Sequence, residues 1–320
     1  MIHQTNPSIE IVILTRDRPN YLKESLESVL SQTYSKNVNF RVSDNSDGTE
    51  SMDMMAEYEI VRYIKRNPTL PGIEHFKTVI DESSCEYLVL FHDDDRMLPN
   101  FIESSLKYFA KYPDAVAIGS NARVINKDAR LLRNSWLKRN HVKKYCEPVD
   151  LLLDYLPGSS GSSPFPSYIY KRNVISSEMI SYHQGGKYSD VSFLANITRV
   201  GPIYSIPDVL MEYRVHSNND SGHKSIEQYF TLWQFMIKEN INRNNVIFKK
   251  WRMQEFARFY IQNNGQKGIL KPIIPVGNRN IILHKTALWV SIKWSPKRYL
   301  FSLIMGWLLK SIYNNKQYNS

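Results

Sequence analysis

The first third of the chain alternates between two patterns of apolar residues. Residues 9–14 and 87–91 are short, nearly continuous apolar runs, as expected for strands buried on both faces, and residues 38–43 and 60–64 are further strand-like segments. Between them, apolar side chains recur at helical spacing over residues 21–30 and 73–80. Strands that alternate with helices predict right-handed βαβ units and a mostly parallel sheet.

The pattern changes along the rest of the chain. Residues 115–119 predict one more strand, and residues 157–167 form a loop too rich in Gly, Ser and Pro for regular structure. From residue 225 onward helical spacing dominates. We therefore expect an α/β domain over residues 1–224 and a helical, basic, amphipathic region over residues 225–320.

Composition narrows the class of protein. Hydrophobic residues make up 42% of the 320 positions, which is ample for a packed core. The two cysteines, Cys85 and Cys146, lack metal-ligand spacing and are too few for a disulfide framework, which favours a reducing compartment. The N-terminal residues lack the pattern of a signal peptide, so we expect a cytoplasmic protein.

Charge is distributed unevenly and points to an anionic partner for the C-terminal region. Residues 241–320 carry a net charge of +13, whereas residues 1–240 carry −3. Residues 289–309 are unusually rich in apolar and aromatic side chains, but their uninterrupted stretch between Arg298 and Lys310 is shorter than the ~20 residues that span a bilayer. A helix lying in the plane of the inner membrane face fits both features. Packing against the catalytic domain, or a dimer interface, is the alternative.

Two acidic clusters directly follow predicted strands. Asp44 comes after the strand at 38–43, and Asp93, Asp94 and Asp95 come after the strand at 87–91. Ligands bind at the carboxyl ends of the strands in such sheets. Three adjacent carboxylates favour Mn²⁺ or Mg²⁺, although a solvated turn that caps the next helix is the alternative interpretation.

Five segments, in this order, resemble the family 2 glycosyltransferases, which have the GT-A fold. They are IEIVILTRDRPNYLKESLESVLSQTY, VSDNSDGT, YLVLFHDDDRMLPNF, GGKYSDVSFLANI and IPDVLMEYRVHSNNDS. The resemblance covers about residues 8 to 221 and implies a GT-A domain, Rossmann-like, with helices on both sides of the sheet. The C-terminal helical extension lies beyond it.

The resemblance also implies a role for each matching residue. Thr15 and Arg16 flank the nucleotide, Asp44 holds its base, Asp93 lies on the donor side, Asp94 and Asp95 hold the metal, His216 reaches the diphosphate or the metal, and Asp190 is the general base. Two positions depart from the family pattern. His92 stands where the family often has its first Asp, and Ser189 replaces an acid that often precedes the base.

The implied reaction is an inverting transfer of a single hexose-type sugar from a nucleotide-diphosphate sugar, a UDP- or dTDP-sugar, to an acceptor hydroxyl. The acceptor is expected to be a glycan or a lipid-linked molecule in bacterial surface polysaccharide assembly. The Gln-x-x-Arg-Trp motif of processive polymerases is absent from the sequence, which favours addition of one sugar.

Other functions are less consistent with the sequence. A sugar nucleotidyltransferase or a dehydrogenase needs a glycine-rich loop after the first strand, where this chain has Thr15-Arg16-Asp17-Arg18-Pro19. A membrane- or polyanion-binding module that uses the basic C-terminal region would not explain the aspartate cluster. We therefore expect an enzyme, and we expect no nucleic-acid partner. A catalytically degenerate GT-A scaffold stays open because of His92 and Ser189.

Overall fold

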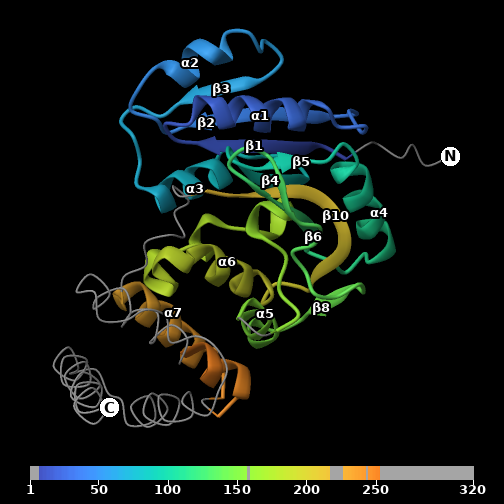
Figure 1. Cartoon of the computed structure of the whole chain (residues 1–320), viewed down its shortest axis with the longest axis vertical. Helices are drawn as coiled ribbons and strands as arrows, with labels where there is room; N and C mark the ends of the chain where they lie inside the picture. Colours follow the sequence, from blue (N-terminus) through green and yellow to red (C-terminus); the bar gives the residue numbers. More distant parts are fainter. Residues whose placement is uncertain (1–6, 157–158, 217–225, 243, 253–320) are drawn as a thin grey trace, which may run out of the picture. The chain divides into compact units, whose positions relative to one another are not determined.

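The computed structural model describes residues 7–156, 159–216, 226–242 and 244–252. Within these ranges one mixed sheet of ten strands has the order β3-β2-β1-β4-β9-β6-β10-β5, with β7 paired to β6 and β8 paired to β10 (Figure 1). The predicted α/β class is confirmed, and strands β3, β2, β1 and β4 form a parallel half, as the alternating pattern indicates.

The elements have the following bounds. The strands are β1 (Ile9–Thr15), β2 (Val38–Asp44), β3 (Arg62–Lys65), β4 (Tyr87–His92), β5 (Arg96–Met97), β6 (Ala117–Asn126), β7 (Leu131–Arg133), β8 (Lys143–Tyr145), β9 (Tyr168–Lys171) and β10 (Ile203–Val215). The α-helices are α1 (Pro19–Leu30), α2 (Glu50–Met55), α3 (Gly72–Asp81), α4 (Phe101–Lys111), α5 (Pro148–Tyr155), α6 (Ser189–Ile197) and α7 (Ile226–Lys238).

Helices cover both faces of the sheet, which explains the continuous apolar run of β1. Its residues Ile9, Ile11 and Ile13 pack into a core with helices α1, α2 and α4. Val12 and Leu14 point to the opposite face and pack into a second core with helices α3, α5 and α6. Successive side chains of a strand alternate between faces, so a strand covered on both sides is apolar at nearly every position.

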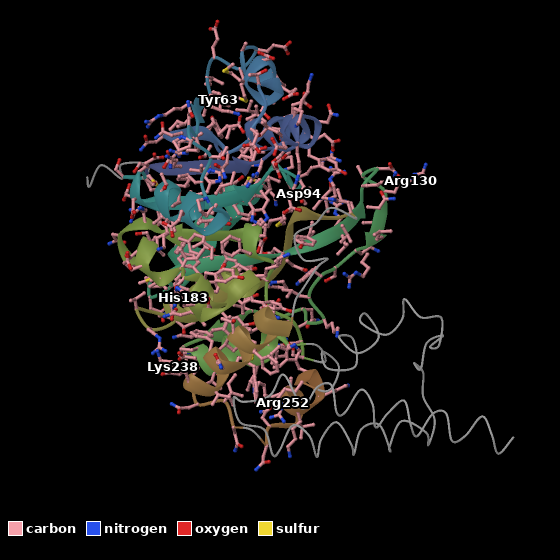
Figure 2. The ribbon with its side chains drawn as sticks, turned by 90° about the vertical axis from the view of Figure 1, so that its left-hand side faces the viewer. Tyr63, Asp94, Arg130, His183, Lys238 and Arg252 are labelled. Carbon is pink, nitrogen blue, oxygen red and sulfur yellow. The ribbon has the colours of Figure 1, made fainter. Side chains whose placement is uncertain are left out.

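The strand register brings the predicted site residues to one edge of the sheet. Thr15 at the end of β1 is paired with Asp44 at the end of β2, and Leu14 is paired with His92 at the end of β4. Asp44 is paired in turn with Lys65 of β3. Figure 2 shows Asp94, just beyond β4, at this end of the sheet.

The second half of the sheet differs from the expected parallel arrangement. β9 runs antiparallel between β4 and β6, directly after the Gly/Ser/Pro-rich loop. The strand predicted at 115–119 extends to Asn126 as β6, because it pairs in parallel with the long β10. Neither pairing has a local signal, since both depend on residues far away in the chain.

The compact unit that contains the sheet runs to Ile241 and includes α7. The expected boundary at residue 224 lies outside the described residues, and so does the membrane helix proposed for residues 289–309. Within the described ranges, no helix has the length and apolar character needed to cross a bilayer.

Candidate active site

The loop after β1 holds two of the three carboxylates that follow β4. Thr15 Oγ1 donates a hydrogen bond of 2.8 Å to Asp93 Oδ2, and the backbone N–H of Arg16 donates to the same oxygen at 3.3 Å. One nitrogen of Arg18, Nη1, lies 3.1 Å from Asp93 Oδ1 and 3.0 Å from Asp94 Oδ2. A single guanidinium therefore contacts both carboxylates and offsets only part of their negative charge.

The end of β10 holds the other side of the cluster. The backbone N–H of Arg214 donates to Asp95 Oδ1 at 2.8 Å, and its Nε donates to the carbonyl oxygen of Asp94 at 2.8 Å. His216 Nε2 lies 2.9 Å from Asp94 Oδ2. The sheet thus brings residues near position 94 together with residues near 215, and His216 lies beside a carboxylate to which the resemblance assigns the metal.

Arg214 is almost fully buried and carries several further contacts. Its Nη2 pairs with Glu24 at 2.5 Å, and its Nη1 donates to the carbonyl oxygen of Lys127 at 3.1 Å. The guanidinium also lies over the ring of Tyr21, and the centroid of that ring lies 5.1 Å from the centroid of the His216 ring. Arg214 therefore joins α1, β6 and β10 directly behind the carboxylates.

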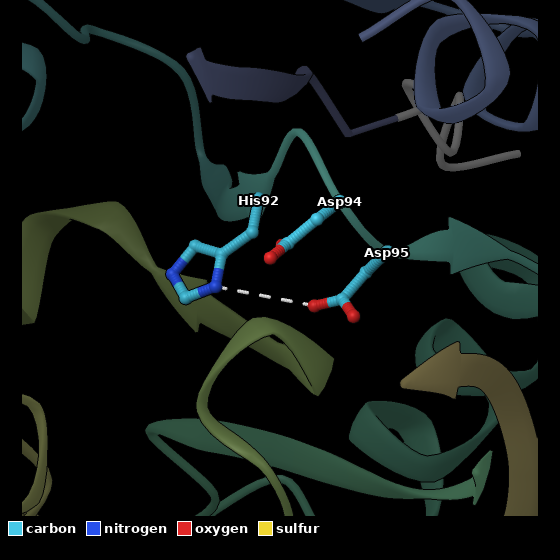
Figure 3. Close-up of side chains that lie close together, drawn as sticks. All are labelled: His92, Asp94 and Asp95. Atoms are coloured by element: carbon cyan, nitrogen blue, oxygen red, sulfur yellow. Dashed lines mark ion pairs between the residues drawn. The ribbon is translucent and has the colours of Figure 1, made fainter. Parts of the chain in front are cut away.

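One group of side chains among the described residues has the composition and spacing of a metal site. One ligand atom each of His92, Asp94 and Asp95 lies within 4.8 Å of the others, and Figure 3 shows the three side chains converging. Asp95 Oδ2 is buried and receives no hydrogen bond from a described residue, and His92 Nδ1 lies 3.9 Å from it. An orphaned carboxylate oxygen beside a second carboxylate and an imidazole fits a divalent cation such as Mn²⁺ or Mg²⁺.

Electrostatics support the same interpretation. Burial raises the pKa of Asp93 to about 7, with Arg18 opposing this shift and the neighbouring Asp94 adding to it. Burial, together with the charge of Asp94, also raises the pKa of Asp95 well above its ordinary value. Because buried carboxylates that repel one another are costly, a cation among them would stabilise the charged forms.

Asp44 is fully buried at the end of β2, and three groups hold its carboxylate. Ser46 donates its backbone N–H to Oδ1 at 2.8 Å, while the Tyr63 hydroxyl at 2.5 Å and Lys65 Nζ at 3.2 Å donate to Oδ2. Burial alone would raise the pKa of Asp44, but these hydrogen bonds outweigh it and lower the pKa. The side chain of Ser46 also contributes to the lowered pKa, so Asp44 is held in its charged form at the end of β2.

Asp190 lies in the first turn of α6, an element separate from those that carry the carboxylates after β4. Its charge reaches the buried hydroxyl of Tyr170 in β9 and contributes, after burial and Tyr168, to raising the pKa of that hydroxyl. The expected helix is present. The role of Asp190 as general base stays a prediction.

Sequence reasoning missed several residues that hold the predicted ones in place: Arg18, Glu24, Tyr63, Lys65 and Arg214. Arg18 had a local signal, because it immediately precedes the Pro19 that begins α1 and follows the strand that ends at Thr15. Tyr63 and Lys65 are two residues apart on β3 and therefore share a face. That this face lies beside Asp44 follows only from the β2–β3 register, which pairs Asp44 with Lys65.

Comparisons with known proteins agree with this architecture. Residues 10–162 match the model of Glycosyl transferase family 2. An uncharacterized glycosyltransferase of Haemophilus influenzae is 22% identical over 253 residues, covering 76% of this chain and 74% of the relative. The O-antigen biosynthesis glycosyltransferase WbnJ of Escherichia coli is 22% identical over 245 residues, covering 74% of this chain and 91% of WbnJ.

Among solved structures, the crystal structure of S. aureus TarS 1-349 in complex with UDP-GlcNAc superposes with a TM-score of 0.60 at 13% identity. The match covers 91% of this chain and 82% of the TarS chain, and at this identity it shows a shared fold. The order of strands, the carboxylates at their ends and the match to the family together lead to one conclusion: the chain carries a family 2 glycosyltransferase domain with the GT-A fold.

Proposed function

We propose that this glycosyltransferase moves one sugar from a nucleotide-diphosphate sugar to an acceptor hydroxyl in a metal-dependent reaction with inversion. The observation that carries the proposal is the group of His92, Asp94 and Asp95, with the buried Asp95 Oδ2 left without a hydrogen-bond donor among the described residues. Carboxylate oxygens in such a group are suited to a divalent ion that also binds phosphate oxygens.

The donor side of the site is the edge formed by β1, β2 and β3. Asp44 is assigned to the nucleobase or ribose. Thr15 is paired with Asp44 in the β1–β2 register, and Thr15 and Arg16 both donate hydrogen bonds to Asp93. UDP-sugars are the first candidates because S. aureus TarS, which shares the fold, is described in complex with UDP-GlcNAc. A dTDP-sugar is the second candidate.

The chemical step assigns a separate task to each group. Mn²⁺ or Mg²⁺, when held by Asp94, Asp95 and an imidazole of His92 or His216, supplies positive charge for the departing diphosphate. Asp190 takes the proton of the acceptor hydroxyl, whose oxygen attacks the anomeric carbon from the face opposite the diphosphate. Arg18 and His216 hold Asp94 in position during this step.

The acceptor is proposed to belong to bacterial surface polysaccharide or lipid-linked glycan assembly at the inner face of the membrane. The name of the relative WbnJ, an O-antigen biosynthesis glycosyltransferase, supports this class of acceptor. The basic, apolar residues 289–309 support a membrane surface as the place of reaction.

The test is release of nucleoside diphosphate from a panel of UDP-, dTDP- and GDP-sugars with Mn²⁺, Mg²⁺ or EDTA. We expect slow hydrolysis of one donor, lost in EDTA. With an acceptor extract, Asp190→Asn should lower transfer by about 10²- to 10⁴-fold. The matched variant Glu178→Gln, which changes an exposed acid before α6, should behave as wild type. Equal transfer by Asp190→Asn and wild type would exclude the base role, and binding of no nucleotide would favour the degenerate scaffold.

A further inference from the structure

The hairpin formed by β6, β7 and the turn between them combines exposed apolar side chains with exposed basic ones. All three residues of β7 are exposed, with Leu131 at 52% and Leu132 at 56%. Successive side chains of a strand point to opposite faces, so both faces of β7 meet solvent. An exposed pair of leucines on an edge strand is unusual, because exposed apolar edges favour pairing with another chain and are ordinarily protected by charged side chains, proline, bulges or a covering element.

Cations flank the two leucines. Residues 127–133 contain Lys127, Arg130 and Arg133, all exposed, against the single acid Asp128. Lys127 Nζ lies 3.9 Å from Asp128 Oδ1, so the one acid of the hairpin is paired with one of its three cations. The other two cations leave the hairpin with a net positive charge. Figure 2 shows Arg130 at the outer tip of the hairpin, at the same end of the sheet as Asp94.

The hairpin is an ordered structure rather than a loose loop. Asn126 Oδ1 accepts hydrogen bonds from the backbone N–H groups of Asp128 at 3.0 Å and Arg130 at 2.8 Å, which closes the turn. At its base, the carbonyl oxygen of Lys127 accepts from Arg214, the residue that also binds Asp95. The hairpin is therefore fixed relative to the active site.

A third exposed apolar side chain continues this surface toward the site. Val215 of β10 is 42% exposed and pairs with Asn126 of β6, and the next residue, His216, contacts Asp94. Val215 thus places one more exposed apolar side chain next to the base of the hairpin and one residue before His216. A polyanionic polymer would need only the cations, whereas an anionic lipid surface uses both the cations and the exposed leucines.

We propose that the β6–β7 hairpin, through Leu131 and Leu132 and the cations Lys127, Arg130 and Arg133, docks the catalytic domain on an anionic lipid membrane. Because Leu131 and Leu132 point to opposite faces of β7, the hairpin enters the headgroup region with this edge strand first, while the cations meet lipid phosphates. Docking at this position holds the carboxyl edge of the sheet, with Asp94, near the membrane, where a lipid-linked acceptor is presented. This contact would act in addition to any made by residues 289–309.

The test is co-sedimentation of the full chain with vesicles of phosphatidylcholine, with or without phosphatidylglycerol, in the absence of donor and metal. Two hairpin variants are compared, Arg130→Gln/Arg133→Gln and Leu131→Ser/Leu132→Ser. The charge-matched control is Lys107→Gln/Lys111→Gln. Both lysines lie on α4, which leads into the start of β6, whereas the hairpin follows the end of β6. Circular dichroism and thermal unfolding check that each variant folds as wild type does.

We expect wild type and the control to bind phosphatidylglycerol vesicles equally. Each hairpin variant should bind these vesicles more weakly than wild type, by about tenfold or more. Wild-type binding by both hairpin variants, or no vesicle binding by wild type, overturns the proposal. Loss of binding in the arginine variant alone, with the leucine variant unaffected, also overturns it and indicates a polyanion as the partner. Because the measurement needs no donor, its failure leaves the proposed glycosyl transfer untouched.

Discussion

The backbone N–H of Arg214 donates a hydrogen bond of 2.8 Å to Asp95 Oδ1, although the two residues are 119 positions apart. The guanidinium of the same residue donates to the carbonyl oxygen of Asp94 and pairs with Glu24 of α1. One buried residue at the end of β10 therefore fixes both the main chain and a side chain of the carboxylate cluster.

Arg214→Lys keeps the positive charge and the backbone N–H but loses the planar fork that reaches several acceptors at once. We expect donor turnover and Mn²⁺ affinity to fall by roughly 10- to 100-fold, as for other groups that orient metal ligands. Arg96→Lys is the matched control, because Arg96 is 41% exposed and only pairs with Glu212 at the surface. Turnover and metal affinity equal to wild type in Arg214→Lys would remove this role.

Arg18→Gln should have opposite effects on metal and donor. Arg18 Nη1 contacts both Asp93 and Asp94, so its removal leaves more negative charge for a divalent cation. We expect Mn²⁺ to bind about fivefold more tightly by calorimetry and donor turnover to fall. Arg16→Gln serves as the control for metal affinity, because the Arg16 side chain is 53% exposed and pairs with Asp17 and Asp47. Weaker Mn²⁺ binding in Arg18→Gln would contradict this account.

Tyr63→Phe removes the 2.5 Å hydrogen bond to the buried carboxylate of Asp44. Since hydrogen bonds to buried charged groups stabilise by about 2 kcal/mol, we expect the free energy of unfolding in urea to fall by about that amount. Tyr58→Phe is the control, because the Tyr58 hydroxyl bonds Glu27 at 3.4 Å in an exposed position. If the two variants lose equal stability, Tyr63 does not support Asp44 in this way.

Protonation of the buried His75 should lower the free energy of unfolding in acid. Burial, assisted by Arg66, lowers the pKa of His75 from 6.5 to about 4, and its Nε2 lies 2.7 Å from Ser43 Oγ. The unfolded chain therefore binds the proton more readily than the folded one, and stability falls as the pH drops from 6.5 to 4. The loss should reach at most about 3 kcal/mol. His75→Gln should flatten this part of the stability–pH curve, and an unchanged curve would refute the assignment.

The parallel half of the fold could be predicted because its strands are covered on both faces and therefore apolar throughout. The acidic cluster could be predicted because three aspartates follow one such strand directly. Arg214 and the pair Tyr63 and Lys65 could not be assigned, since their partners are set by the β10–β6 and β2–β3 registers. Strand β9 was missed for the same reason, because four residues after a glycine-rich loop carry no periodic signal.

Calorimetry of UDP binding tests the metal-dependent donor site most directly. Wild type, Asp95→Asn and the control Glu212→Gln, which alters an acid in β10 outside the cluster, would each be titrated with UDP in Mn²⁺ and in EDTA. The account predicts that wild type and Glu212→Gln bind UDP in Mn²⁺ and lose most of this affinity in EDTA, whereas Asp95→Asn binds weakly in both. Equal UDP affinity of wild type in Mn²⁺ and in EDTA would contradict it.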